Sequence, residues 1–209
     1  MEMYIKKQEK LPENGKKLFL QTSEFYGSAD LGLGDMFQIY TYITGYKLSA
    51  DTLVDAFING HLTKFDNYIY SIIYNYKQFI ELSMKTIYYL HSNETLESIE
   101  QNITRVNQNL VLTWGLIEPL LNQIYTTAED VNVMNAAKEY IIEFQNFIEK
   151  SFDFIYPFTI DIITSSSTEK RIDVINLKER IEELYQFFNQ SDWALVEYLE
   201  SKNSEAHTL

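Results

Sequence analysis

The stretch Phe65 to His91, which contains neither glycine nor proline, constrains the fold most strongly. Its apolar and small side chains recur at steps of three and four residues, the spacing that places them on one face of an α-helix. The residues of this face are Ile69, Ile72, Ile73, Tyr76, Ile80, Ser83, Met84 and Ile87. Lys77 and Glu81 lie one position round from the face and four residues apart, so they can form an ion pair along the helix flank. We therefore predict a long helix over 65–91, with a charged pair that is either ordinary helix surface or a site of chemistry.

The composition of the whole chain favours helices. Only 3 prolines and 7 glycines occur in 209 residues, and no glycine follows Gly115, which is untypical of a turn-rich β protein. Hydrophobic residues make up 45% of the chain, far too many for a disordered protein and enough for a sizeable core. We predict an all-α bundle of five to seven helices, with antiparallel helices over 35–60 and 65–91 at its centre. A short extended or hairpin element is expected near 152–170.

The predicted organisation is a single helical domain over 35–201. An N-terminal arm or loop over 1–34 precedes it, and a flexible polar tail over 202–209 follows it. A short capped helix is expected after His91, and another after Ser191. The remaining predicted helices span residues 107–124, 128–152 and 174–189.

Glycine, proline and capping residues predict where these helices end or become irregular. Asp35 is suited to cap the first helix, and Gly60 is suited to end it. Gly45 lies inside that helix, where glycine is less stable than alanine, so we expect it to mark a close helix crossing or a bend. Pro119 should kink or break its helix, and Ser191 should begin a short final helix.

The chain is strongly acidic, with a formal net charge of −13. Non-specific affinity for nucleic acid comes from Lys and Arg that neutralise phosphates, so binding to duplex DNA is not expected. The charge is uneven, because five lysines lie within residues 6–17 whereas 94–153 carries ten acidic residues against three basic ones. Two interpretations stay open: a solvated acidic surface, or an acidic face that binds a basic partner protein.

Cysteine is absent, which excludes disulfides, thiolate metal sites and a cysteine nucleophile. No window approaches the roughly 18 apolar residues of a membrane span. Residues 1–17 also lack the apolar run of a signal peptide. We expect a cytoplasmic protein that does not engage a membrane.

The residues alone indicate no reaction. His61, His91 and His207 are the only histidines, and none pairs with another histidine or a carboxylate at helical ligand spacing. The HExxH, Walker A and G-x-S-x-G motifs are also absent. No catalytic residue, metal site or cofactor is therefore predicted.

Five segments carry a family resemblance: GYKLSADTLVDAF, YNYKQFIELSMKTIYYL, NQNLVLTWGLIEPLL, SFDFIYPF and INLKERIEELYQFF. Together, over about residues 35–190, they resemble HEPN-type domains, helical proteins of bacterial toxin–antitoxin and phage-defence systems. The positions that agree with this group are Tyr76, Ile80, Glu81, Leu82, Leu110, Trp114, Tyr156 and Pro157. Because HEPN-like domains commonly pair through helix faces, the resemblance implies a homodimer.

The polar residues that characterise the group are replaced in this chain. Lys77 stands where the group has Arg, and Gln78 and Gln108 stand where it has His. Ile155 stands where a second Arg is expected. Active HEPN ribonucleases use an Arg closely followed by His, and no Arg here has such a His. Because glutamine cannot exchange a proton near neutral pH, the resemblance implies a member that lacks the Arg/His catalytic marks.

Three functions follow from these observations. The prediction is a non-catalytic HEPN-like domain that binds another protein in a defence or toxin–antitoxin setting, as inhibitor, antitoxin or regulatory subunit. One alternative is an RNase or nucleotide-processing enzyme with an atypical site. The other is a small-molecule or nucleotide sensor with a pocket between helix 65–91 and the Tyr156-Pro157 element. The candidate ligand- or partner-binding groove consists of Tyr76, Lys77, Glu81, Gln108 and Tyr156.

Overall fold

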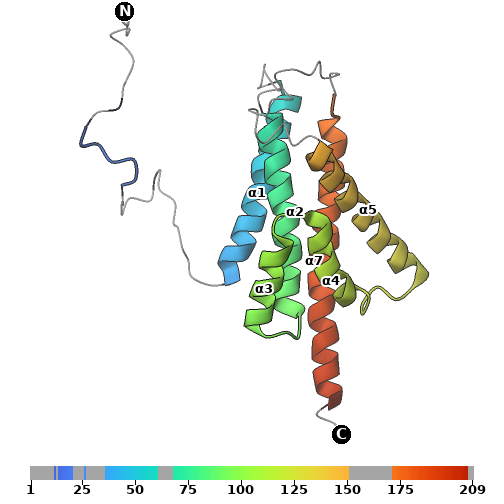
Figure 1. The fold of residues 1–209 in the computed structure, drawn as a ribbon. Coiled ribbons are helices and arrows are strands. Elements are labelled where there is room, and N and C mark those ends of the chain that lie inside the picture. The colour runs from blue at the N-terminus through green and yellow to red at the C-terminus, as the bar shows by residue number, and fades with distance from the viewer. Residues whose placement is uncertain are drawn as a thin grey trace, which may run out of the picture. The chain divides into compact units, whose positions relative to one another are not determined.

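The computed structural model divides into two compact units, residues 1–34 and 35–209. The described part of the second unit is helical and contains no strand (Figure 1), which confirms the predicted all-α bundle. The extended or hairpin element predicted near 152–170 lies outside the described residues. The structure describes residues 12, 14–20, 26, 36–60, 68–150 and 171–206. The helices in these ranges are α1 (Met36–Ile58), α2 (Ile69–His91), α3 (Leu96–Val106), α4 (Leu110–Leu121), α5 (Ala128–Lys150) and α7 (Val174–Ala206).

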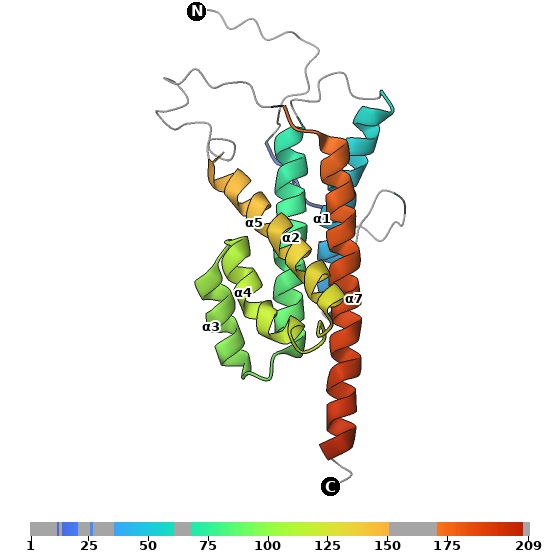
Figure 2. The ribbon, with the colours of Figure 1, turned by 90° about the vertical axis from the view of Figure 1, so that its right-hand side faces the viewer.

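α1 and α2 form the predicted antiparallel pair (Figure 1). α1 is followed by Gly60 with a φ of +73°, the left-handed conformation that glycine favours beyond a helix end. α2 packs against α1, α3, α4 and α7, and 12 of its residues are buried. Figure 2 shows α5 running obliquely across α2 and α7, and both views show α7 extending beyond the other helices at its C-terminal end.

The predicted face of α2 forms the core of the bundle. Ile69 and Ile73 are half-buried, and the other six residues of that face are buried. Phe79 of α2 packs edge-on against Phe188 of α7, with ring centroids 6.1 Å apart. Trp114 of α4 stacks on Phe187 of α7 at 6.0 Å. Aromatic contacts therefore join α2 and α4 to two consecutive residues of α7.

Side-chain caps explain where α3 and α4 begin. The hydroxyl of Thr95 accepts a hydrogen bond from the Ser98 backbone N–H at 3.3 Å. Asn109 Oδ1 accepts one from the Leu112 N–H at 2.9 Å. Each bond satisfies a backbone donor that the first turn leaves without a partner. Pro119 lies inside α4, which ends at Leu121, so the predicted helix over 107–124 was too long at both ends.

The prediction of two helices around Ser191 is wrong. α7 is one continuous helix of 33 residues. Ser191 is fully buried inside it, and its hydroxyl donates to the Phe187 carbonyl at 2.8 Å instead of capping a new helix. A serine with this backward bond is tolerated within a helix. α7 also continues through Lys202 to Ala206, so the tail predicted to be flexible from 202 is helical in its described part.

No helix in the described ranges combines the length and the apolar character needed to cross a membrane.

Candidate functional site

Lys77 and Glu81 of α2 form the predicted ion pair, but they are not ordinary helix surface. The Lys77 ammonium contacts Glu81 Oε2 directly, and only 7% of Lys77 and 5% of Glu81 are exposed. Lys77 Nζ also donates to Gln108 Oε1 at 3.2 Å, from the turn between α3 and α4. The structure therefore brings together three of the five predicted groove residues: Lys77, Glu81 and Gln108.

Lys85 completes this cluster, and the sequence reasoning missed it. Its ammonium donates to Glu81 Oε1 at 2.6 Å and to the Asn107 carbonyl at 2.7 Å. Asn107 has a φ of +50°, a conformation that is uncommon for residues other than glycine. The Lys85 bond thus fixes the turn that presents Gln108 to Lys77. The four-residue spacing from Glu81 to Lys85 was the signal that could have revealed it.

The cluster contains two ammonium groups, one carboxylate and one neutral amide. Both carboxylate oxygens of Glu81 are engaged, one by each lysine. Burying charges is costly unless they are paired, so the arrangement depends on each partner being present. The cluster carries a net positive charge, and its hydrogen bonds connect α2 to the α3–α4 turn.

Tyr76 belongs to a different network. Its side chain is fully buried, and its hydroxyl donates to Asp51 Oδ1 of α1 at 2.7 Å. Burial, and then the hydrogen bond to this carboxylate, raise the pKa of Tyr76. Lys47 of α1 binds both Asp51 and Glu182 of α7, each at 2.7 Å. Tyr76 thus helps to tie α1, α2 and α7 together, apart from the Lys77 cluster.

The predicted groove as a whole stays a prediction. Tyr156 lies outside the described residues, as do Pro157 and Ile155. Tyr76 and Lys77 are adjacent in sequence, yet their polar atoms join separate networks. The structure therefore describes four of the five groove residues, and three of them, Lys77, Glu81 and Gln108, lie in one cluster.

A second cluster was missed by the sequence reasoning. His91 Nε2, at the end of α2, lies 2.6 Å from Asp192 Oδ1 of α7. Tyr40 of α1 donates its hydroxyl to the other oxygen of Asp192 at 2.9 Å. Burial, and then this bond, raise the pKa of Tyr40 to about 12. His91 and Asp192 are 101 positions apart, so no spacing rule along one helix could have found the pair.

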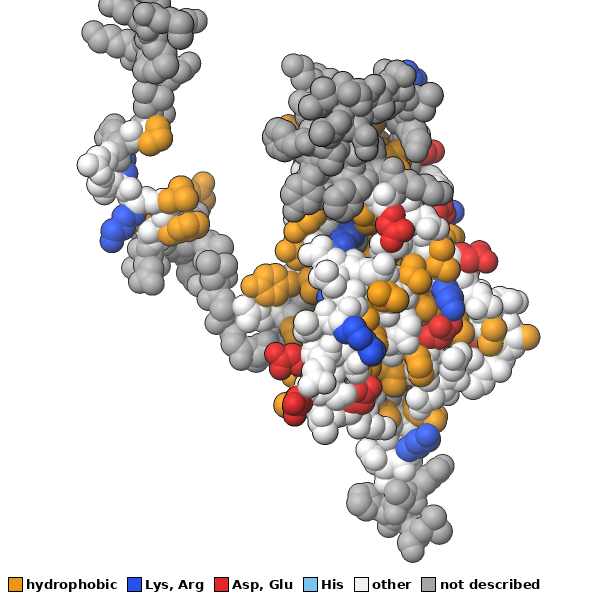
Figure 3. Space-filling model, in the orientation of Figure 1, with side chains coloured by type: hydrophobic (Ala, Val, Ile, Leu, Met, Phe, Trp, Pro, Cys, Tyr) orange, Lys and Arg blue, Asp and Glu red, His pale blue; other side chains and the backbone are white. Residues whose placement is uncertain are grey.

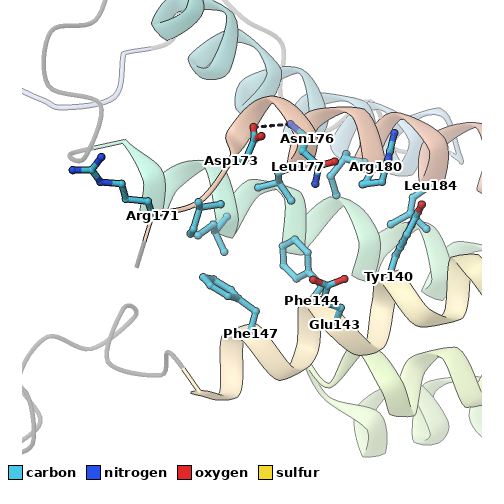
Figure 4. A pocket seen from close by; sticks show the side chains of 13 residues that line it. Tyr140, Glu143, Phe144, Phe147, Arg171, Asp173, Asn176, Leu177, Arg180 and Leu184 are labelled. Carbon is cyan, nitrogen blue, oxygen red and sulfur yellow. Dashed lines mark hydrogen bonds between the residues drawn. The ribbon is translucent and has the colours of Figure 1, made fainter. Parts of the chain in front are cut away.

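A pocket of about 300 Å³ lies between α5 and the start of α7 (Figure 4). Phe144 and Phe147 of α5 face Leu177 of α7 across it (Figure 4). Glu143 adds a carboxylate from α5, and Ile73 of α2 also lines the pocket. Besides these apolar side chains, the pocket is lined by charged and polar ones, namely Glu143, Arg171, Asp173, Asn176 and Arg180. Apolar walls with a few polar groups are a common composition for small-molecule sites.

No three His, Asp or Glu side chains in the described ranges lie close enough together to hold a metal ion. Comparison of the chain with protein-family models, with curated proteins and with solved structures finds no match.

Proposed function

We propose that the chain is a non-catalytic, HEPN-like helical domain that acts in the cytoplasm by binding another protein. The setting is a bacterial or phage defence or toxin–antitoxin system, in which the chain serves as inhibitor, antitoxin or regulatory subunit. The observation that carries this proposal is Trp193, whose side chain is 72% exposed on α7. Tryptophan is among the residues most enriched at the energetic centres of protein interfaces.

The surroundings of Trp193 favour a basic partner. Val196, Glu197 and Glu200 are also exposed, three, four and seven residues further along α7. At these spacings their side chains lie on the same side of the helix as Trp193. A central aromatic and an aliphatic group with acidic neighbours match the general pattern of an apolar interface core and a charged rim. The net charge of −13 would further steer a basic partner towards the chain.

Acidic side chains also gather elsewhere on the bundle. Glu94, Glu97 and Glu100 are exposed on and before α3, where Figure 3 shows acidic side chains together. Such a surface repels the phosphates of duplex DNA, which supports a protein partner over a nucleic-acid one.

The Lys77 cluster supports binding over catalysis. Lys77 and Gln108 stand at two positions where the resembled group has Arg and His. Here their side chains are hydrogen-bonded to each other, and Lys77 also contacts Glu81. A glutamine amide cannot act as a general base near neutral pH. The cluster is therefore suited to hold the α3–α4 turn in place.

A tagged-protein pull-down from native lysate tests the proposal. The expected result is a specific basic protein that the wild type retains and Trp193→Ala does not. Leu112→Ala is the matched control, because Leu112 is an exposed apolar residue on α4, away from Trp193 in the chain. Recovery of nothing beyond background, or equal recovery with Trp193→Ala, contradicts the proposal.

The pocket between α5 and α7 favours one alternative, a small-molecule or nucleotide sensor. Its aromatic walls could hold a flat ring, and Arg171 and Arg180 also line it. A thermal-shift panel of nucleotides tests this alternative, because a ligand that binds only the folded state raises its apparent stability. Stabilisation that Phe144→Ala abolishes would favour the sensor.

The RNase alternative is tested by incubation with total RNA. Cleavage by the wild type that is lost in both Lys77→Ala and Glu81→Ala would favour it, provided that both variants remain folded by circular dichroism. The present proposal predicts no cleavage.

A further inference from the structure

The pocket between α5 and α7 contains a carboxylate that the rest of the described bundle does not use. Glu143 lines the pocket, and within the described ranges its side chain has no hydrogen-bond or ion-pair partner. Asp173, which also lines the pocket, accepts from the backbone N–H groups of Ile175 and Asn176, each at 3.0 Å, and so caps the start of α7. The carboxylate of Glu143 is therefore available to a molecule that enters the pocket.

Two arginines also line the pocket, but their placement does not favour an anion inside it. Arg180 Nη2 lies 2.8 Å from Glu183 Oε1 and 3.6 Å from Glu179 Oε2, so two carboxylates already offset its charge. Figure 4 shows the guanidinium of Arg171 extending away from the ring of Phe144. The positive charges at the pocket are thus either paired or directed away from its aromatic wall.

Tyr140, on the α5 wall of the pocket, responds to the sign of the local charge. Its hydroxyl donates to Glu183 Oε2 at 3.0 Å. Burial, then this hydrogen bond and the charge of Glu183, raise the pKa of Tyr140; Glu143 raises it further, whereas Arg180 lowers it by less than the charge of Glu183 raises it. The carboxylates therefore outweigh the guanidinium at this wall, which favours a positively charged ligand group.

The pocket suits a ligand with an apolar body and one charged end. Its volume of about 300 Å³ lies at the lower end of the range for small-molecule sites, enough for one ring and a short chain. Its lining residues Phe144, Ile181 and Leu184 are buried, whereas Glu143 is exposed. An apolar body can therefore enter while an ammonium group stays partly in water beside Glu143, which avoids the cost of burying a charge completely. The face of an aromatic ring such as that of Phe144 also attracts cations.

We propose that this pocket binds a small organic cation, a primary ammonium group carried on an aromatic body. The ammonium pairs with Glu143, and the body packs between Phe144 of α5 and Leu177 of α7. Ligands that carry phosphates are disfavoured by the same carboxylates. This site goes beyond the protein binding proposed around Trp193 and is independent of it.

Three probes that share one aromatic body and differ in charge test the site: phenethylamine, phenethyl alcohol and phenylacetate. Each is titrated into the isotope-labelled full chain near neutral pH, and the backbone amide shifts are followed by two-dimensional NMR. The amine should bind about fivefold more tightly than the alcohol, the upper range for a solvent-exposed ion pair. Phenylacetate should bind more weakly than either. The saturable shifts should centre on residues 140–147 and 172–184.

Glu143→Gln should remove the preference for the amine while leaving the affinity for the alcohol unchanged. Glu139→Gln is the matched control, because Glu139 is exposed on the same helix about one turn earlier and does not line the pocket. This control should keep the fivefold preference. Added salt should weaken binding of the amine more than binding of the alcohol, since it screens an exposed pair. Circular dichroism should show native helix content in both variants.

The absence of saturable shifts with all three probes overturns the proposal, as do shifts centred outside the two ranges. Tighter binding of phenylacetate than of the amine also overturns it, because the arginines would then determine the charge of the ligand. So does a preference for the amine that survives Glu143→Gln or is lost in Glu139→Gln. None of these outcomes affects the pull-down through Trp193.

Discussion

Glu81 is the residue whose neutralisation should reveal the buried cluster most clearly. Its carboxylate accepts from Lys77 through one oxygen and from Lys85 through the other. Glu81→Gln keeps the shape of the side chain but leaves one amide oxygen to serve two ammonium groups. The amide NH₂ then faces the second ammonium, so donor meets donor.

The magnitude follows from these contacts. One hydrogen bond to a charged group is lost, worth about 1.5–3 kcal/mol. The other becomes a bond to a neutral acceptor, roughly half as strong. Lys85 has a side chain 17% exposed and can gain some solvation. We therefore expect Glu81→Gln to lower the free energy of unfolding by about 3 kcal/mol, the low end of the range for breaking a buried ion pair.

Urea denaturation followed by far-ultraviolet circular dichroism measures this loss. The midpoint should fall while the m-value stays constant, which indicates a change in stability without a change in the surface exposed on unfolding. Glu100→Gln on the exposed side of α3 is the matched control and should change the free energy of unfolding by less than about 0.5 kcal/mol. A Glu81→Gln effect as small as that of the control would refute the reasoning, because it is the value expected for a solvated pair.

Three further predictions concern Tyr40, Glu182 and Leu195. Asp192→Ala should lower the pKa of Tyr40 from about 12 towards its ordinary value of 10.0, measured by ultraviolet absorbance of tyrosinate with Tyr40→Phe as reference. The hydrogen bond from the Lys47 ammonium lowers the pKa of Glu182 from its ordinary value of 4.5. The resulting stabilisation is therefore fully present above pH 4.5 and is lost as the pH falls through the lower, folded-state pKa. Glu182→Gln should make the melting temperature less sensitive to pH in this acidic range. Leu195→Ala should lower the free energy of unfolding in urea denaturation by about 2–5 kcal/mol, because Leu195 is buried in the core on α7. A loss near that of a surface substitution would contradict the burial of Leu195.

The sequence predicted the helices best where apolar periodicity is long. The apolar face of α2 repeats over about five turns, so the pattern determined both the helix and its buried side. The prediction was wrong at Ser191 because a serine followed by aspartate is typical of a helix start. The helix continues through Ser191 because of tertiary packing, since Ser191 and Leu195 extend the buried side of α7 beyond Phe188.

The candidate site was predictable only in part. The four-residue spacing indicated the Lys77–Glu81 pair, and the family resemblance, not any local pattern, pointed to Gln108. The burial of the pair depends on the α3–α4 turn packing over α2, which no residue spacing encodes. His91 and Asp192 meet only because α2 and α7 lie side by side.

Binding of a protein partner through Trp193 is tested most directly by a quantitative comparison of the proteins that the wild type and Trp193→Ala retain from the same native lysate. At least one basic protein should be enriched with the wild type, lost with Trp193→Ala and kept with Leu112→Ala. Equal retention by all three proteins, or no retention above background, would contradict a protein-binding role through the surface around Trp193.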